Sequence, residues 1–341
     1  MRRGLSVFVG ALLVAILSIG VSFLPVPYVA LGPGPTVDTL GDVDGKDVIT
    51  VTGTPTSTSK GHLNLTTVSV SSDLDLGSAV RYWLDGRYAV VPREAVIPAG
   101  QSEQQVDQRN AQAFKESQTS AETAALRVLG YPVAVTVTGL PAGSPSAGAL
   151  AAGDVVTTVD AKPVTSATRL RELVAAQKPG RAVAVGYTRA GRAATARVTL
   201  GRADDDSTRA VLGVQIENRQ PHPFDVRFDL DRIGGPSAGL MFALGVVDKV
   251  KPEDLTGGRF IAGTGEIDDD GEVGPIGGIP QKMRAARKAG ATVFLAPADN
   301  CAEAAGAVPD GLRRVRIETL DGALAALDAL RAGRSTPTCT R

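Results

Sequence analysis

The residues of this 341-residue chain best suited to chemistry are one serine and one lysine. Ser237 lies in the run Gly-Gly-Pro-Ser-Ala-Gly, and Lys282 lies at the start of a later stretch with helical periodicity. A serine hydroxyl is a weak nucleophile until a neighbouring base takes its proton, and a neutral lysine amine is one such base. The pair therefore predicts hydrolysis through an acyl-enzyme.

A strand and a helix are expected to position the serine. The alternating run Phe224–Leu230 predicts a half-buried strand, and the apolar run Met241–Val247 predicts a buried helix. The glycine- and proline-rich corner between them would present the hydroxyl beside unpaired N–H groups at a helix N-terminus. Gly235, Pro236 and Ala238 are thus expected to shape an oxyanion hole from the backbone N–H groups of residues 235–238.

The surroundings of Lys282 favour a neutral amine. The lysine opens a predicted helix, Met283–Ala289, which Gly290 can terminate. A helix N-terminus disfavours the ammonium form, and so does burial beside Ile276 and Ile279. Both effects lower a lysine pKa towards neutrality.

Three motifs resemble the proteolytic domain of Lon-type serine peptidases. They are Gly-Gly-Pro-Ser-Ala-Gly (234–239), Thr-Gly-Glu-Ile (264–267) and the long run from Gly271 to Gly290 that contains Pro-Ile-Gly-Gly-Ile. The resemblance implies that Ser237 is the nucleophile, Lys282 the general base and Thr264 the hydroxyl that orients the lysine. It covers residues 45–129 and 205–332, since Lys-Glu-Ser at 115–117, followed by Ala121–Leu126, also looks like the helix that begins that domain's central part.

Residues 130–201 interrupt this domain and resemble a bacterial-type PDZ domain. The resemblance rests on the run Ala-Gly-Ala-Leu-Ala-Ala-Gly-Asp (147–154), a Lys-Pro-Val turn, a helix from Ser166 and a closing hairpin. It implies that an extended peptide adds as a strand beside Val133–Thr138. The implied peptide-binding residues are Gly130, Tyr131, Val133 and Val135. A PDZ-shaped spacer that binds nothing is the alternative.

The N-terminus predicts a membrane anchor over residues 1–30. Arg2 and Arg3 precede about 20 mostly apolar residues, Leu5–Leu24, which is enough to span a bilayer. The positive-inside rule then keeps the N-terminus cytoplasmic and places the body outside. A cleaved signal peptide is the alternative. Outside the cytoplasm Cys301 and Cys339 could pair and pin the tail, residues 333–341, or could remain thiols.

Composition argues against several other functions. The formal net charge is zero, from 36 basic and 36 acidic residues, which argues against nucleic acid as a partner. Two histidines and two cysteines leave little for a metal site. We expect the acidic run Asp268–Asp270 to be a solvated turn, with a cation site as the remote alternative. The sequence holds no phosphate-binding Gly-x-x-x-x-Gly-Lys loop, so no ATPase module and no cofactor are predicted.

Taken together, these patterns predict an α+β fold. Val48–Gly53 and Leu63–Val70 are expected to be paired strands. The arrangement looks like the membrane-anchored PDZ–Lon proteins of Gram-positive bacteria. We expect an extracytoplasmic serine endopeptidase that cuts unfolded or membrane-proximal polypeptides, and the resemblance implies a ring-shaped homo-oligomer. A non-catalytic PDZ adaptor and a self-processing protease are the alternatives.

Overall fold

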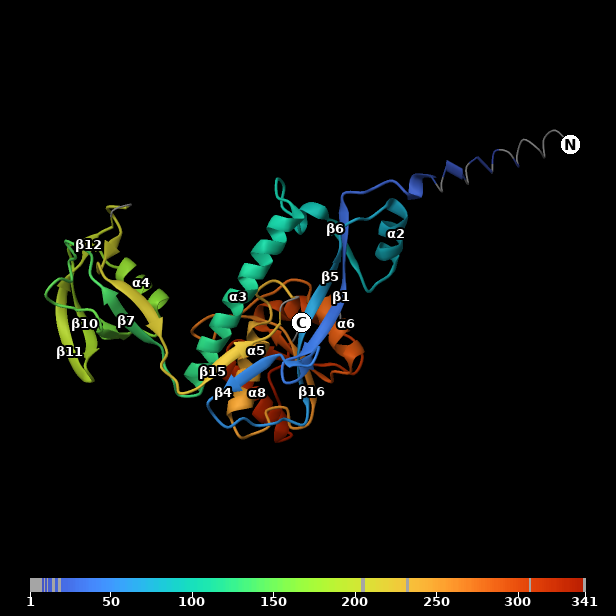
Figure 1. Ribbon diagram of the computed structural model, residues 1–341. Coiled ribbons are helices and arrows are strands. Elements are labelled where there is room, and N and C mark those ends of the chain that lie inside the picture. The colour runs from blue at the N-terminus through green and yellow to red at the C-terminus, as the bar shows by residue number, and fades with distance from the viewer. Residues whose placement is uncertain are drawn as a thin grey trace. The chain divides into compact units, whose positions relative to one another are not determined.

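The structure is a computed structural model, and it divides into two compact units. It describes residues 20–203, 206–230, 233–306 and 308–339, together with residues 8, 10, 12, 13, 16 and 17. The first unit comprises residues 1–121, 226–268 and 272–341, and the second comprises residues 122–225 with 269–271 (Figure 1). One unit is therefore inserted into the other along the sequence, as the two resemblances predict.

The first unit is built on a six-stranded mixed sheet with the strand order β20-β19-β16-β5-β1-β6. Its strands are β1 (Tyr28–Asp38), β5 (His62–Ser71), β6 (Ala89–Pro92), β16 (Phe260–Gly263), β19 (Val293–Pro297) and β20 (Arg313–Ile317). The strands from β20 to β5 run parallel, while β1 is antiparallel to both β5 and β6. Every residue of β19 is buried, because strands inside a parallel sheet are covered on both faces.

Shorter strand pairs complete the first unit, and one of them differs from the pairing that the sequence predicted. The expected pair of 48–53 with 63–70 does not form, because β5 already has β1 and β16 as its neighbours. The strand at 48–53 instead pairs with the one that leads towards Ser237. The short pairs are β4 (Ile49–Thr52) with β15 (Asp225–Phe228), β2 (Asp42–Val43) with β3 (Lys46–Asp47), and β17 (Glu266–Ile267) with β18 (Val273–Gly274).

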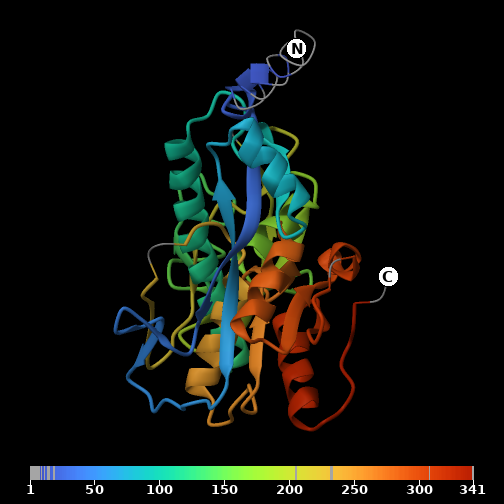
Figure 2. The same cartoon turned by 90° about the vertical axis from the view of Figure 1, so that its right-hand side faces the viewer.

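Helices cover this sheet (Figure 2). They are α2 (Leu76–Leu84), α3 (Glu103–Val128), α5 (Gly239–Val250), α6 (Ile279–Ala289), α7 (Cys301–Ala305) and α8 (Leu320–Arg331), with short 3-10 turns η1 (Arg93–Ala95) and η2 (Ala298–Asn300). Helix α5 is buried from Gly239 to Asp248, which explains why its sequence is apolar all round. Helix α6 packs on β1 and β5. The sheet thus supports the two helices that follow Ser237 and carry Lys282.

The second unit is a sheet with one principal helix. Its strand order is β11-β10-β8-β7-β14, with β9 beside β8. The elements are β7 (Ala134–Gly139), β8 (Val155–Val159), β9 (Lys162–Pro163), α4 (Ala167–Ala175), β10 (Ala182–Arg189), β11 (Arg192–Thr199), β12 (Gly201–Arg202), β13 (Ala210–Val211) and β14 (Gln215–Arg219). Ser166 caps α4 as predicted, since its hydroxyl accepts from the Arg169 N–H at 3.0 Å.

The second unit extends further along the chain than the predicted PDZ segment, 130–201. Strand β14 pairs with β7, so residues that we expected to belong to the catalytic segment from 205 onwards pack with the second unit. The chain returns to the first unit only after Asp225. The segment was misassigned because its alternating pattern indicates a strand but does not identify the partner strand.

Cys301 and Cys339 form a disulfide. It ties the C-terminal tail to α7, and the tail is held further by Arg313, which donates to the Thr336 hydroxyl at 2.9 Å. The sequence left open whether these two cysteines pair or remain thiols, and in the structure they are paired.

Among the described residues, no helix is long and apolar enough to cross a membrane. Nine of the 20 residues of the predicted span, Leu5–Leu24, lie outside those that the structure describes.

Candidate active site

The corner that carries Ser237 is held in place by helix α3. Gly235 adopts a φ of 86°, a left-handed conformation that favours glycine, and its N–H donates to the Asn110 carbonyl at 2.8 Å. The Ser117 hydroxyl donates to the Pro236 carbonyl at 2.9 Å. The sequence predicts a helix around Ser117, but it predicts no role at the site for Asn110 or for Ser117. Both lie far from the corner in sequence, so no local pattern indicates the contact.

The structure brings Ser237, Lys282 and Thr264 together. Lys282 Nζ lies 2.8 Å from Ser237 Oγ and 2.9 Å from Thr264 Oγ1. Thr264 Oγ1 also donates to the main-chain carbonyl of Ser237 at 2.9 Å. Lys282 is 3% exposed and Thr264 is fully buried. The hydroxyl and the amine are therefore within proton-transfer distance, and the amine itself is largely closed to water.

Lys282 lies in the first turn of α6. The helix begins at Ile279, four residues before the predicted Met283, and the Lys282 N–H donates to the Gly278 carbonyl at 3.1 Å. Gly278 precedes the helix with a φ of 71°. This position points the positive end of the helix dipole towards the amine.

Asn300 fixes the loop before this helix. Its Oδ1 accepts from the Ile276 N–H and its Nδ2 donates to the Ile276 carbonyl, each at 2.8 Å. Asn300 also precedes α7, but its side chain does not cap that helix because the amide is engaged by Ile276. A buried amide that satisfies both backbone groups of one residue holds that residue in a single position.

Burial lowers the pKa of Lys282 to about 8, while the nearby Glu266 carboxylate opposes the change. Burial in turn raises the pKa of Glu266, and the lysine charge opposes that shift. An amine with this pKa has a substantial neutral fraction at mildly alkaline pH, which an ordinary lysine lacks. The site can therefore supply a base to the serine hydroxyl without a histidine.

A cavity of about 440 Å³ opens in front of Ser237 and Lys282. Its walls include Glu266 and the apolar side chains of Val68, Val70 and Ile276.

The predicted contribution of Gly235 and Pro236 to an oxyanion hole needs correction, because the Gly235 N–H donates to the Asn110 carbonyl and proline has no N–H. Within the part of the chain that the structure describes, the N–H groups of Ser237 and Ala238 at this corner donate to no other backbone group, so they are left for an oxyanion.

The predicted peptide-binding edge of the second unit is an interior strand. Val135 in β7 faces Asn218 of β14 on one side and Val156 of β8 on the other, so β7 cannot accept a further strand. Gly130 and Tyr131 follow the end of α3, and the Tyr131 N–H donates to the Leu126 carbonyl at 2.8 Å. Val133 is buried in the apolar core of this unit. None of these four predicted residues lines the groove described next.

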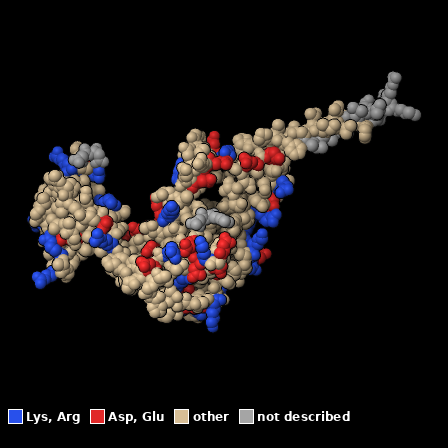
Figure 3. Space-filling view, in the orientation of Figure 1, with Lys and Arg blue, Asp and Glu red and all other residues tan. Residues whose placement is uncertain are grey.

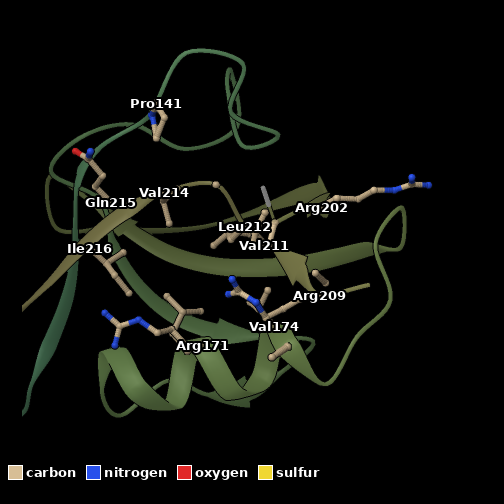
Figure 4. Close-up of a pocket in the computed structure, with 15 residues that line it drawn as sticks. Pro141, Arg171, Val174, Arg202, Arg209, Val211, Leu212, Val214, Gln215 and Ile216 are labelled. Atoms are coloured by element: carbon tan, nitrogen blue, oxygen red, sulfur yellow. The ribbon is translucent and has the colours of Figure 1, made fainter. Parts of the chain in front are cut away.

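A groove of about 700 Å³ lies instead between α4 and the segment 209–216 (Figure 4). Leu170 and Val174 line it from the helix, and apolar side chains at 212, 214 and 216 line it from the other side. Within the described residues β14 pairs only with β7, so its other edge can accept a strand. The one sequence signal for this wall is the alternating run Leu-Gly-Val-Gln-Ile at 212–216.

Arginines surround this groove. Arg171, Arg202 and Arg209 all line it. Figure 4 shows the Arg171 side chain extending sideways from α4, the Arg209 side chain lying over the helix, and Arg202 pointing away from the groove. The groove is therefore apolar in its walls and basic at its margin.

Other titratable groups have local structural partners. Asp270 pairs with Arg127 at 2.6 Å, and Asp268 accepts from the Glu272 N–H at 2.9 Å. His222 Nδ1 lies 2.6 Å from the Gln220 carbonyl. Among the described residues no group of three or more His, Cys, Asp or Glu side chains could hold a metal ion. Figure 3 shows acidic and basic side chains interspersed over that face of the first unit.

Comparison with known families assigns a class to each unit. Residues 232–326, which contain Ser237 and Lys282, match the C-terminal proteolytic domain of Lon protease (S16). Residues 106–200 match the PDZ domain. The chain therefore carries a serine-type peptidase domain of the Lon class together with a PDZ domain.

Individual relatives agree with this class. The chain is 39% identical over 90 residues to the Lon protease of Heliobacterium modesticaldum, covering 26% of this chain and 11% of that protein. It is 35% identical over 130 residues to Lon protease 1 of Sorangium cellulosum, covering 37% and 16%. The chain thus spans less than a fifth of the length of these relatives. The PDZ domain of an SdrC-like protein from Listeria innocua is 25% identical over 26% of this chain and 99% of that one, with a TM-score of 0.24.

Proposed function

We propose that the protein is a serine endopeptidase in which Ser237 and Lys282 form a catalytic dyad. The observation that carries the proposal is the 2.8 Å approach of Lys282 Nζ to Ser237 Oγ, made by a lysine that is 3% exposed. Neutral Lys282 takes the hydroxyl proton as Ser237 Oγ attacks the scissile carbonyl. The N–H groups of Ser237 and Ala238 stabilise the resulting oxyanion.

The second half of the reaction uses the same lysine. Protonated Lys282 donates to the departing amine, leaving an acyl group on Ser237 Oγ. Lys282, neutral again, then takes a proton from the water that attacks the acyl-enzyme, and collapse of this intermediate returns the proton to Oγ. Thr264 keeps the amine in place throughout, because its oxygen lies 2.9 Å from Nζ.

The substrates in this proposal are polypeptides in an unfolded or exposed state. The walls of the 440 Å³ cavity include the apolar side chains of Leu65, Val68 and Ile276, which suit a peptide side chain. The groove of the second unit would hold the substrate by strand addition on β14, and its arginines complement a carboxylate. The PDZ unit then supplies recognition, and the Lon-type domain cuts.

The proposal places this activity outside the cytoplasm, on a membrane anchor at residues 5–24. The apolar N-terminal run and the two arginines before it support the orientation. The Cys301–Cys339 disulfide is consistent with an oxidising compartment, where such bonds persist.

The test uses the full-length protein, purified in detergent, with unfolded casein and an internally quenched peptide as substrates. We expect Ser237→Ala and Lys282→Ala each to lower kcat/KM by at least about a thousandfold. Lys288→Ala, an exposed lysine on the same helix, is the matched control and should keep activity. Undiminished hydrolysis in either dyad variant would refute the mechanism. Wild-type protein that cuts neither substrate would favour an adaptor, or a protease that processes only itself.

The groove is tested separately by binding. A peptide with a free C-terminus should bind Ser237→Ala protein at least about tenfold more tightly than its amidated form. Val174→Glu should abolish that binding, since it places a charge in the apolar wall. Arg192→Glu, at an exposed position on β11, is the control. Equal affinity for both peptides would rule out carboxylate recognition.

A further inference from the structure

Helix α2 has apolar side chains on two faces. Ala79 packs inwards beside Ala30 of β1, and the Tyr82 ring contacts Tyr88 with centroids 4.5 Å apart. The outer face carries Leu76, Val80, Trp83 and Leu84, which are 37%, 46%, 71% and 72% exposed. These four positions follow the helical period, so they form one apolar stripe that faces solvent. Contiguous apolar surface of this kind marks an interaction site.

The stripe is part of a wider apolar surface. Phe23, Leu24 and Tyr28 are 68%, 55% and 42% exposed. Between this segment and the helix lies a hollow of about 180 Å³. The hollow is lined by apolar and aromatic side chains alone, from Val26, Tyr28, Leu76, Ala79, Val80, Trp83 and Val90. We call the stripe and residues 23–28 together the α2 surface.

Main-chain hydrogen bonds hold α2 against the end of the N-terminal apolar run. The Val26 N–H donates to the Leu74 carbonyl at 3.0 Å, and the Leu76 N–H donates to the Leu24 carbonyl at 2.9 Å. Asp75 then caps the helix by accepting from the Ser78 N–H at 2.7 Å. Figures 1 and 2 both show α2 beside this segment. The α2 surface is thus fixed where the predicted span, Leu5–Leu24, ends.

We infer that the α2 surface lies in the boundary between the head groups and acyl chains of a lipid bilayer. It continues the apolar run of the proposed anchor, and the inference rests on that part of the proposed function. Tryptophan and tyrosine, here Trp83 and Tyr28, are the side chains preferred at this depth. Arg81, 5.6 Å from the Tyr82 ring centroid, lies beside the stripe and can reach lipid phosphates. The body therefore has a second contact with the membrane, beyond the anchor.

Trp83 is the single tryptophan of the chain, so its fluorescence reports on this surface alone. The full-length protein is reconstituted into phosphatidylcholine–phosphatidylglycerol vesicles, with or without lipids brominated near the head group. We expect bromolipid to quench Trp83 by about half and aqueous iodide to quench it severalfold less than in Leu84→Glu protein, as insertion to this depth requires. Leu84→Glu should lose the lipid quenching while remaining on the vesicles. Val80→Asn, which adds a polar group without a charge, should also lower the quenching by bromolipid while the protein remains on the vesicles.

Controls separate this inference from the anchor and from catalysis. Ala325→Glu adds the same charge at an exposed position of α8 and should leave quenching unchanged. Vesicle flotation reports the anchor, and peptide hydrolysis by Leu84→Glu protein reports the dyad. Protein that floats but whose Trp83 is open to iodide and insensitive to bromolipid contradicts this inference alone. Trp83 that is shielded from iodide without bromolipid quenching also contradicts it and indicates a protein partner. Protein that does not float contradicts the anchor and this inference together.

Discussion

Thr264 Oγ1 lies 2.9 Å from Lys282 Nζ, and its own proton is committed to the main-chain carbonyl of Ser237. The hydroxyl must therefore accept from the lysine rather than donate to it. A neutral amine has two N–H bonds and one lone pair. With one N–H directed to Thr264, the lone pair can turn towards Ser237 Oγ, 2.8 Å away. Thr264 thus determines which side of the Lys282 amine faces the Ser237 hydroxyl.

Replacing Thr264 tests this orientation. Thr264→Val keeps the shape of the side chain but removes both hydrogen bonds, so we expect kcat to fall by about ten- to a hundredfold with little change in KM. Thr264→Ser retains the hydroxyl and should recover most of the activity. The measurement is steady-state hydrolysis of the quenched peptide. A valine variant with wild-type kcat would remove Thr264 from the mechanism.

The pH dependence of hydrolysis should follow Lys282. Because its pKa is lowered to about 8, kcat/KM should rise with pH and level off above that value. Below it the neutral fraction, and hence the rate, should fall about tenfold per pH unit. Glu266→Gln removes the charge that holds this pKa up, so its profile should shift to lower pH. If the pH profile of kcat/KM is not shifted in Glu266→Gln, the rise of kcat/KM with pH reports the titration of another group.

Lys282 should also cost the protein stability at neutral pH. Its pKa is about 8 in the folded state and 10.5 ordinarily, so the unfolded chain binds more protons between these values and stability rises with pH there. Below pH 8 the full cost is present, about 3 kcal/mol from the size of the shift. Lys282→Met should therefore raise the free energy of unfolding at pH 7, by about 1–2 kcal/mol after its lost hydrogen bonds.

Urea denaturation at pH 7 and pH 10 measures this difference. The gap between Lys282→Met and the wild type should shrink at pH 10, where the wild-type lysine is neutral when folded. Lys288→Met, at an exposed site on the same helix, should show no such gap at either pH. A methionine variant less stable than the wild type at pH 7 would show that the hydrogen bonds outweigh burial of the charge.

Asn300 should affect catalysis without touching substrate. Asn300→Leu leaves the Ile276 N–H and carbonyl without partners, which should lower stability by about 1–3 kcal/mol. Without the two hydrogen bonds from Asn300, the loop before α6 should position Lys282 less accurately. We expect kcat to drop about tenfold while KM stays nearly constant. Asp299→Ala, its exposed neighbour, is the control. A loss of stability with unchanged kcat would limit Asn300 to a structural role.

The sequence predicted the residues of the site better than the scaffold around them. Ser237, Thr264 and Lys282 each lie in a short motif that resembles the Lon-type proteolytic domain, and this resemblance implied that the three residues act together. Asn110 and Asn300 support the site through single long-range contacts, which no local pattern encodes. The partners of the strands could not be predicted either, because alternating apolar and polar residues indicate a strand without indicating which strand pairs with it. For this reason the groove was expected along β7 although β14 forms the edge.

The parallel pairing of β5 with β16 has a consequence for how the enzyme is made. His62 lies opposite Phe260, so about 200 residues must be synthesised between the two strands before they can meet, a contact that is slow to form. Thr264 follows β16 directly, and Lys282 comes later still. The nascent chain therefore contains Ser237 well before it contains Lys282, its proposed base. The proposed dyad can form only after Lys282 and both of these strands have been synthesised.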